Sequence, residues 1–191
     1  SYYGDGTQDD KSQVATNCGY SMDCSTSLWL QNFGKNQGWE SYDKYPRFFA
    51  DINNDGRKDI IGCGAAGVLA SLNLGNNTFG SPYFVITNDF CFNKGWNSQN
   101  TFPRFVVDIN KDNKPDIVGF GSYGVRVYLG NGSGGFNLAS SYTYGGFGNA
   151  NQNGGYISQS IHPRYLEDVD GDGDLDIIGF GQNYVLVAKN T

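Results

Sequence analysis

Short apolar stretches alternate with polar, turn-rich segments along almost the whole chain. Residues 67–72 and 124–129 alternate apolar and polar side chains with a period of two, which is typical of a β-strand with one buried face. Segments rich in glycine and asparagine, such as residues 75–77 and 130–132, predict tight turns between the strands. No stretch approaches the ~18 apolar residues that a membrane-spanning helix requires. The pattern therefore predicts an all-β protein without membrane insertion.

The same pattern occurs three times. Each copy carries a glycine followed by an aromatic residue, a Pro-Arg-aromatic triplet, an acidic loop and an apolar stretch of the Ile-Ile-Gly-Phe-Gly type. The acidic loops begin at Asp51, Asp108 and Asp168, so the copies recur at a nearly constant spacing. A regular recurrence of this kind indicates stacked supersecondary units.

Each copy is predicted to form four short strands, which is the blade of a β-propeller. The first strand follows the Pro-Arg pair, and the second and third cover the apolar and the alternating stretches. The predicted fourth strands span residues 83–88 and 141–144, and the third strand of the last copy spans residues 184–188. We therefore predict three propeller blades over residues 27–191, preceded by a cysteine-containing extension over residues 1–26.

The ends of the pattern predict how the propeller closes. Residues 27–33 align with the fourth-strand segments that end at Phe90 and Phe147, whereas the last copy ends after its third strand. A strand donated by a second chain would complete that blade and protect its open edge. We therefore expect a homodimer with six blades and two-fold symmetry. The alternative is that the chain is a fragment of a longer single-chain propeller.

The composition limits the classes of function. Of 191 residues, 28 are glycine, a density that disfavours long helices, and only one is histidine. A single histidine argues against histidine-based zinc sites and most acid–base chemistry. The formal net charge of -6 argues against nucleic-acid binding, because contacts to phosphates require a basic face.

The acidic loops predict calcium sites. They place acidic or amide oxygens at positions one, three, five and nine and a backbone carbonyl at position seven, and calcium fits such an oxygen donor set best. The loops hold 11 of the 19 acidic residues, and three calcium ions would take the formal charge from -6 to 0. The alternative is that Asp, Asn and Gly simply form turns. The predicted ligands of about three ions per chain are Asp51, Asn53, Asp55, Arg57, Asp59, Asp108, Asn110, Asp112, Lys114, Asp116, Asp168, Asp170, Asp172, Asp174 and Asp176.

The loops and the apolar stretches that follow them resemble the FG-GAP/VCBS repeats of integrin α-chain propellers. The fuller pattern, with Gly-Trp and Pro-Arg-Phe before each loop, is more similar to the mushroom lectins of the Psathyrella velutina type. This resemblance covers residues 27–191 and implies sugar pockets between neighbouring blades, with N-acetylglucosamine, sialic acid or galactose-type sugars as ligands. Cys63 stands where the family has Phe, and Tyr156 stands where it has Trp.

A sugar site needs an aromatic surface and a few fixed polar groups. The repeated aromatics lie at the ends of loops rich in glycine and asparagine and could be such surfaces. The alternative is that they are core residues wedged between blades, and that the repeated arginines pair with acidic neighbours. The candidate carbohydrate-binding residues are Trp39, Trp96, Tyr156, Asn36, Asn93, Asn153, Arg47, Arg104 and Arg164.

These observations predict a calcium-containing, multivalent lectin for N-acetylglucosamine or galactose-type glycans. The alternative is an integrin-like propeller that binds proteins in adhesion. An enzyme is not expected, because the sequence has no unrepeated pairing of a nucleophile with a base.

The cysteines and two glycosylation sequons favour a secreted, extracellular protein. Cys18 and Cys24 lie close together in a polar segment, and we predict a disulfide between them. The pairing of Cys63 and Cys91 stays open, since Cys63 lies in an apolar strand where free cysteine is common. The sequons begin at Asn76 and Asn131.

Overall fold

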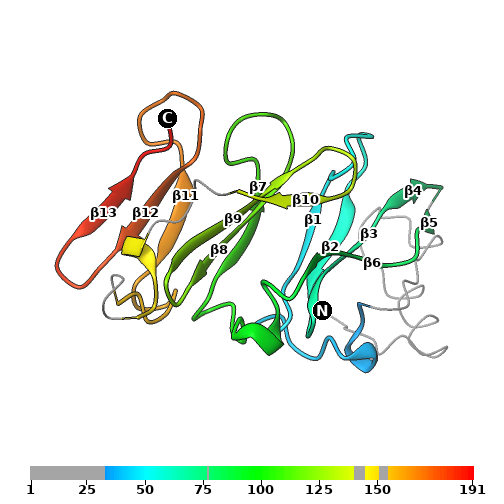
Figure 1. Ribbon diagram of the computed structural model, residues 1–191, viewed down its shortest axis with the longest axis horizontal. Helices are drawn as coiled ribbons and strands as arrows, with labels where there is room; N and C mark the ends of the chain where they lie inside the picture. Colours follow the sequence, from blue (N-terminus) through cyan, green and yellow to red (C-terminus); the bar gives the residue numbers. More distant parts are fainter. Residues whose placement is uncertain (1–32, 77, 140–144, 151–154) are drawn as a thin grey trace, which may run out of the picture.

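The computed structural model describes residues 33–76, 78–139, 145–150 and 155–191. Three antiparallel sheets follow one another along the chain and stand beside each other as blades (Figure 1). The helical elements of the described residues are three single 3-10 turns, η1 (Lys35–Gln37), η2 (Phe92–Lys94) and η3 (Gly145–Phe147). None of the described helices is long and apolar enough to cross a bilayer. The prediction of an all-β propeller is confirmed.

The first blade has four strands in the order β1-β2-β3-β6. An outer hairpin of two further strands, β4 and β5, lies between β3 and β6 along the chain. The fourth strand matches the predicted segment 83–88. The bounds are β1 Arg47–Ala50, β2 Asp59–Cys63, β3 Gly67–Ser71, β4 Asn73–Gly75, β5 Thr78–Phe79 and β6 Tyr83–Thr87.

The second blade also has four strands in the described residues, but its fourth is not the predicted one. The predicted segment 141–144 lies outside the described residues. The sheet instead ends with β10, which begins at Phe136, the counterpart of Phe79 in the first repeat, and pairs with β9 as Phe79 pairs with Asn73. This strand is therefore the counterpart of the outer hairpin. The bounds are β7 Arg104–Val107, β8 Asp116–Gly121, β9 Gly124–Gly130 and β10 Phe136–Leu138.

The third blade has three strands in the described residues, in the order β11-β12-β13. Their bounds are Arg164–Glu167, Asp176–Phe180 and Val185–Ala188. Of the N-terminal segment 27–33, only Phe33 is among the described residues, so the exchange of a strand between chains stays a prediction.

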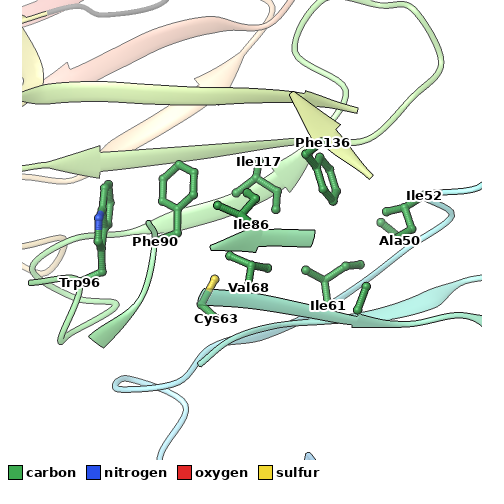
Figure 2. Packing of buried hydrophobic residues seen from close by; sticks show 11 residues of the cluster. Ala50, Ile52, Ile61, Cys63, Val68, Ile86, Phe90, Trp96, Ile117 and Phe136 are labelled. Atoms are coloured by element: carbon green, nitrogen blue, oxygen red, sulfur yellow. The ribbon is translucent and has the colours of Figure 1, made fainter. Parts of the chain in front are cut away.

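Apolar side chains fill the space between the first and second blades. Figure 2 shows Val68, Ile86 and Ile117 pointing toward one another, with Trp96 at one end of the cluster and Ala50 at the other. Because successive side chains of a strand point to opposite faces, the other face of β8 is free to pack against the third blade. There Val118 and Phe120 meet Phe147, Tyr156 and Ile177. Fully burying one such side chain stabilises the fold by roughly 1.5–3 kcal/mol.

Candidate functional site

The repeated aromatic residues are core side chains, and Trp96 and Tyr156 are wedged between two blades. Trp39 and Trp96 are 7% exposed and Tyr156 is fully buried. Each lies over a glycine of its own blade: a Cβ atom on Gly62 would lie 2.5 Å from the Trp39 ring, and one on Gly119 would lie 2.7 Å from the Trp96 ring. The faces of these rings are covered by protein. The expectation of exposed stacking surfaces is therefore not met, although both tryptophans line a pocket.

The repeated arginines hold these wedges in place. Arg104 is fully buried, and its Nη1 donates to the carbonyl of Trp96 at 3.0 Å. Arg47 repeats this bond with the carbonyls of Phe33 and Trp39, at 2.9 and 3.3 Å. The side chain that accepts from Arg104 is Gln99, not the acidic neighbour that the sequence suggested. These bonds give the arginines a structural role.

The third arginine is also enclosed. Arg164 is fully buried, donates to the carbonyl of Thr101 at 3.1 Å and lies 5.4 Å from the centre of the Phe120 ring. Burial lowers the pKa of its guanidinium to about 10. A group in this position cannot reach a ligand on the surface.

The three asparagine candidates have different surroundings. Asn36 and Asn93 are exposed in η1 and η2, and the backbone N–H of Asn93 donates to the carbonyl of Ala65 in the preceding blade at 3.0 Å. Asn153 lies outside the described residues.

One pocket lies beside Trp96 and another beside Trp39. The pocket in the second blade has a volume of about 430 Å³ and that in the first about 520 Å³. All the residues that line the first pocket, except Pro82 and Phe84, align with residues that line the second. The two pockets are therefore one site that occurs in both repeats.

The lining residues come mainly from the loop before the first strand and from the turn between the second and third strands. In the second blade they are Lys94, Gly95, Trp96, Phe102, Gly121, Ser122, Tyr123, Gly124, Val125 and Arg126. In the first blade they are Gln37, Gly38, Trp39, Tyr45, Gly64, Ala65, Ala66, Leu69, Pro82 and Phe84.

Gly121 and Gly64 line the two pockets beside the tryptophans, and this glycine is called the floor of its pocket. A Cβ atom on Gly121 would lie 3.2 Å from the Trp96 ring, so glycine keeps this floor open. Tyr123 stands at the rim with 84% of its surface exposed. Arg126 is fixed by a salt bridge of 2.8 Å to Asp89. Aromatic carbon beside fixed polar groups is the surface that a sugar ring requires.

The sequence pointed to Trp39 and Trp96, which line these pockets, but not to the turn residues that line them as well. Each pocket combines residues from two separate segments of its repeat, and the turn between β8 and β9 carries no motif of its own. The sequence feature that could have indicated the pockets is the aromatic residue directly before the Pro-Arg pair, because Tyr45 and Phe102 both line a pocket.

In the acidic loops, the last aspartate has a structural role in all three repeats. Asp116 is fully buried, and its two oxygens accept backbone N–H bonds from Gly130 at 2.7 Å and Ile109 at 2.9 Å. Asp59 and Asp176 make the equivalent pairs of bonds. Burial raises the pKa of Asp116 to about 6, and the charges of Asp112 and Asp108 add to the rise.

The other side chains of the loops carry oxygen atoms of the type that calcium takes as ligands. In the first loop Asn53 Oδ1 is buried and has no hydrogen-bond partner. In the second, the side-chain nitrogen of Asn110 donates to one carboxylate oxygen each of Asp108 and Asp112 at 3.2 Å, which gathers these two carboxylates around one point.

The third loop holds the tightest group of acidic side chains among the described residues. Ligand oxygens of Asp168, Asp170 and Asp176 lie within 4.8 Å of one another.

Basic side chains already reach each loop. Arg57 pairs with Asp55, and Lys114 pairs with Asp112 at 3.1 Å. In the third loop, Lys189 lies 3.2 Å from Asp170 and lowers the pKa of that carboxyl. Arg57 and Lys114 occupy the seventh loop position, where the sequence predicted a backbone carbonyl ligand. Their positively charged side chains also offset the negative charge of the loop.

Comparison with known proteins identifies the repeats. Residues 108–179 match the model of the FG-GAP-like repeat family. This segment contains the second and third acidic loops. A search of curated proteins finds no match.

Among solved structures, this chain is similar to a lectin of Agrocybe aegerita, described as recognising non-reducing terminal N-acetylglucosamine. The two are 41% identical with a TM-score of 0.73, over 84% of this chain and 38% of that one. The chain thus spans well under half of the lectin's length.

Two TcdB2–TccC3 structures show weaker likeness. They are 17% and 16% identical, each with a TM-score of 0.48, over 72% of this chain and 6% of theirs. A similarity at this level does not bear on function.

Two of the four cysteines, Cys63 and Cys91, are among the described residues. Cys63 and Cys91 are both buried and unpaired, which answers the question left open by the sequence. Burial raises the pKa of the Cys63 thiol to about 11, so this thiol stays protonated and unreactive. Cys18 and Cys24 lie outside the described residues, and their disulfide stays a prediction.

Proposed function

We propose that this chain is a lectin that binds glycans ending in N-acetylglucosamine through the pockets beside Trp39 and Trp96. The observation that carries the proposal is the occurrence of one pocket at equivalent positions of two repeats. The 41% identity to a lectin described as recognising terminal N-acetylglucosamine supports it.

The chemistry of the pockets supports a sugar ligand. A pyranose presents a ring of C–H groups, which packs on aromatic carbon, and hydroxyls, which need fixed donors and acceptors. Tyr123 in the second blade and Phe84 in the first supply exposed aromatic rings at the pocket margins. Two sites on one chain would bind clustered glycans with higher avidity than either site alone.

We also propose that the acidic loops hold calcium. The orphaned oxygen of Asn53 and the carboxylates gathered around Asp168 support this role. A divalent cation there would offset the repulsion between neighbouring carboxylates and hold the loops in one conformation.

The homodimer is likewise a proposal, and an open face on the third blade supports it. Phe180, Val185 and Val187 are 42–55% exposed. Their counterparts in the second blade, Phe120, Val125 and Val127, are buried by the next blade. A second copy of this chain that presents a blade to this face would cover it, as each blade covers the one before. Extracellular location remains part of the same proposal, on the grounds given by the sequence.

Screening on a glycan array, with free N-acetylglucosamine as competitor, tests the lectin proposal. We expect binding to glycans that end in N-acetylglucosamine and its loss on addition of the free sugar. No signal on any glycan, together with specific binding to a protein that persists after deglycosylation, would support the integrin-like alternative instead.

A further inference from the structure

The third repeat differs from the other two at one position of the pocket. Gly67 and Gly124 end the turn between the second and third strands of their blades. When the repeats are aligned on their acidic loops, Tyr184 takes this place in the third. The turn itself is unchanged: the N–H of Gly181 donates to the carbonyl of Tyr184 at 2.9 Å, as Gly64 does to Gly67 at 2.8 Å.

The ring of Tyr184 lies over the floor of the third site. A Cβ atom on Gly181 would lie 2.9 Å from Cζ of Tyr184. Gly181 is the counterpart of Gly64 and Gly121, which form the floors of the two pockets. The third site therefore has the same floor, with an aromatic ring placed on it.

The wedge residue of the third repeat makes room for this ring. Tyr156 replaces the tryptophan, and its phenol oxygen lies over Gly179, 2.6 Å from where a Cβ would be. Burial raises the pKa of Tyr156 to about 12, and Tyr184 beside it contributes to the rise. In the third repeat, Tyr156 thus takes the place of the indole, and the ring of Tyr184 takes the place of the open pocket.

We propose that Tyr184 closes the sugar site of the third repeat, so that only two of the three repeats in a chain bind sugar. The inference rests on the proposed lectin function and specifies which repeats perform it. Tyr184 is a specificity-determining residue, because removing its ring would leave a glycine floor like those of the working sites.

The stoichiometry of sugar binding tests the inference. Equilibrium dialysis of the full chain against saturating radiolabelled N-acetylglucosamine gives the number of sugars bound per chain. We expect two for the unmodified protein, three for Tyr184→Gly and two for Tyr184→Phe, which keeps the ring and loses only the hydroxyl. Since Tyr184 is half exposed, the substitutions should leave the fold intact, which thermal melting of each variant verifies.

Three outcomes would overturn the inference. Three sugars on the unmodified chain would show that the third site is open, and two on Tyr184→Gly would show that the ring is not what closes it. Binding of no sugar by any of the three folded proteins would instead reject the lectin proposal, and the inference with it.

Discussion

The carboxylate of Asp116 accepts a 2.7 Å hydrogen bond from the backbone N–H of Gly130, which ties the acidic loop to the far end of β9. The second oxygen accepts from Ile109 at the start of the same loop. This buried carboxylate thus joins the loop to the sheet, whether or not a cation is bound. Asp116, at the ninth position of this loop, is buried, whereas the side chains at the first, third and fifth positions are more accessible.

Replacing Asp116 with alanine should destabilise the protein severely. The substitution leaves two backbone N–H groups near the core without acceptors, and each such loss costs about 1–3 kcal/mol. Urea unfolding should show a loss of about 2–6 kcal/mol. Asp112→Ala, at an exposed position of the same loop, is the matched control; both variants are unfolded with a chelator present, so that calcium contributes to neither, and Asp112→Ala should then cost far less. Equal losses in the two variants would contradict the account of Asp116.

The glycine beneath each aromatic wedge should not tolerate a side chain. In Gly119→Ala the new Cβ would lie 2.7 Å from the Trp96 ring and closer still to Phe90. Relieving the clash must move the wedge, at a cost of about 1–3 kcal/mol. Gly80→Ala is the control, because its nearest neighbour is 3.8 Å away. Thermal melting should separate the two, and a Gly119→Ala midpoint equal to that of the control would refute the close packing.

Much of the fold could be predicted from the sequence because each blade repeats local signals. The alternation at residues 67–72 and the turn at Gly75 specify a strand and its end without reference to the rest of the molecule, and β3 lies there. The outer strand β10 was missed, since so short a strand carries too little pattern. The correspondence of Phe136 to Phe79 becomes informative only once the hairpin of the first blade is known.

The sugar site was harder to predict, because burial depends on the neighbouring blade. The loop around Trp96 is rich in glycine and asparagine, which suggests exposure. In the structure, however, Trp96 packs over Gly119 of its own blade and against side chains of the first blade. The Gly in each Ile-Ile-Gly stretch was the sequence signal for this close approach. The pocket rim at Tyr123 could not be found, because it meets Trp96 only through the folded turn.

Calcium removal should lower the thermal midpoint of the protein. A ligand that binds only the folded state at a concentration about 100 times its Kd adds about 2.7 kcal/mol of stability. Differential scanning calorimetry with and without a strong chelator measures the change. Asp170→Asn should reduce the effect of calcium, because it weakens the group formed with Asp168 and Asp176. A midpoint that the chelator leaves unchanged would reject calcium binding.

The open face of the third blade should hold a dimer together. Light scattering should give twice the chain mass of 20.9 kDa. Val187→Glu places a charge on the proposed interface and should shift the mass to that of one chain, whereas Leu74→Glu, at an exposed site on the first blade, should not. The mass of a single chain for the unmodified protein would contradict the dimer.

Aromatic rings at the pocket margins should contribute to sugar affinity. Removing them in Tyr123→Ala/Phe84→Ala loses contacts worth about 0.5–1.5 kcal/mol each, which weakens binding roughly 2- to 13-fold per site. Titration calorimetry with N-acetylglucosamine measures the change. Tyr42→Ala is the control, because it removes an exposed ring that lines neither pocket. The affinity of this variant for the sugar should equal that of the unmodified protein. A double variant that binds as tightly as this control would exclude the rings from the site.

A crystal structure of the protein soaked in N-acetylglucosamine tests the central claim most directly. The account predicts a sugar in the pocket between Trp96 and Tyr123 and another in the equivalent pocket beside Trp39. Sugar bound elsewhere on the blades, or density for sugar in neither pocket at saturating concentration, would contradict it.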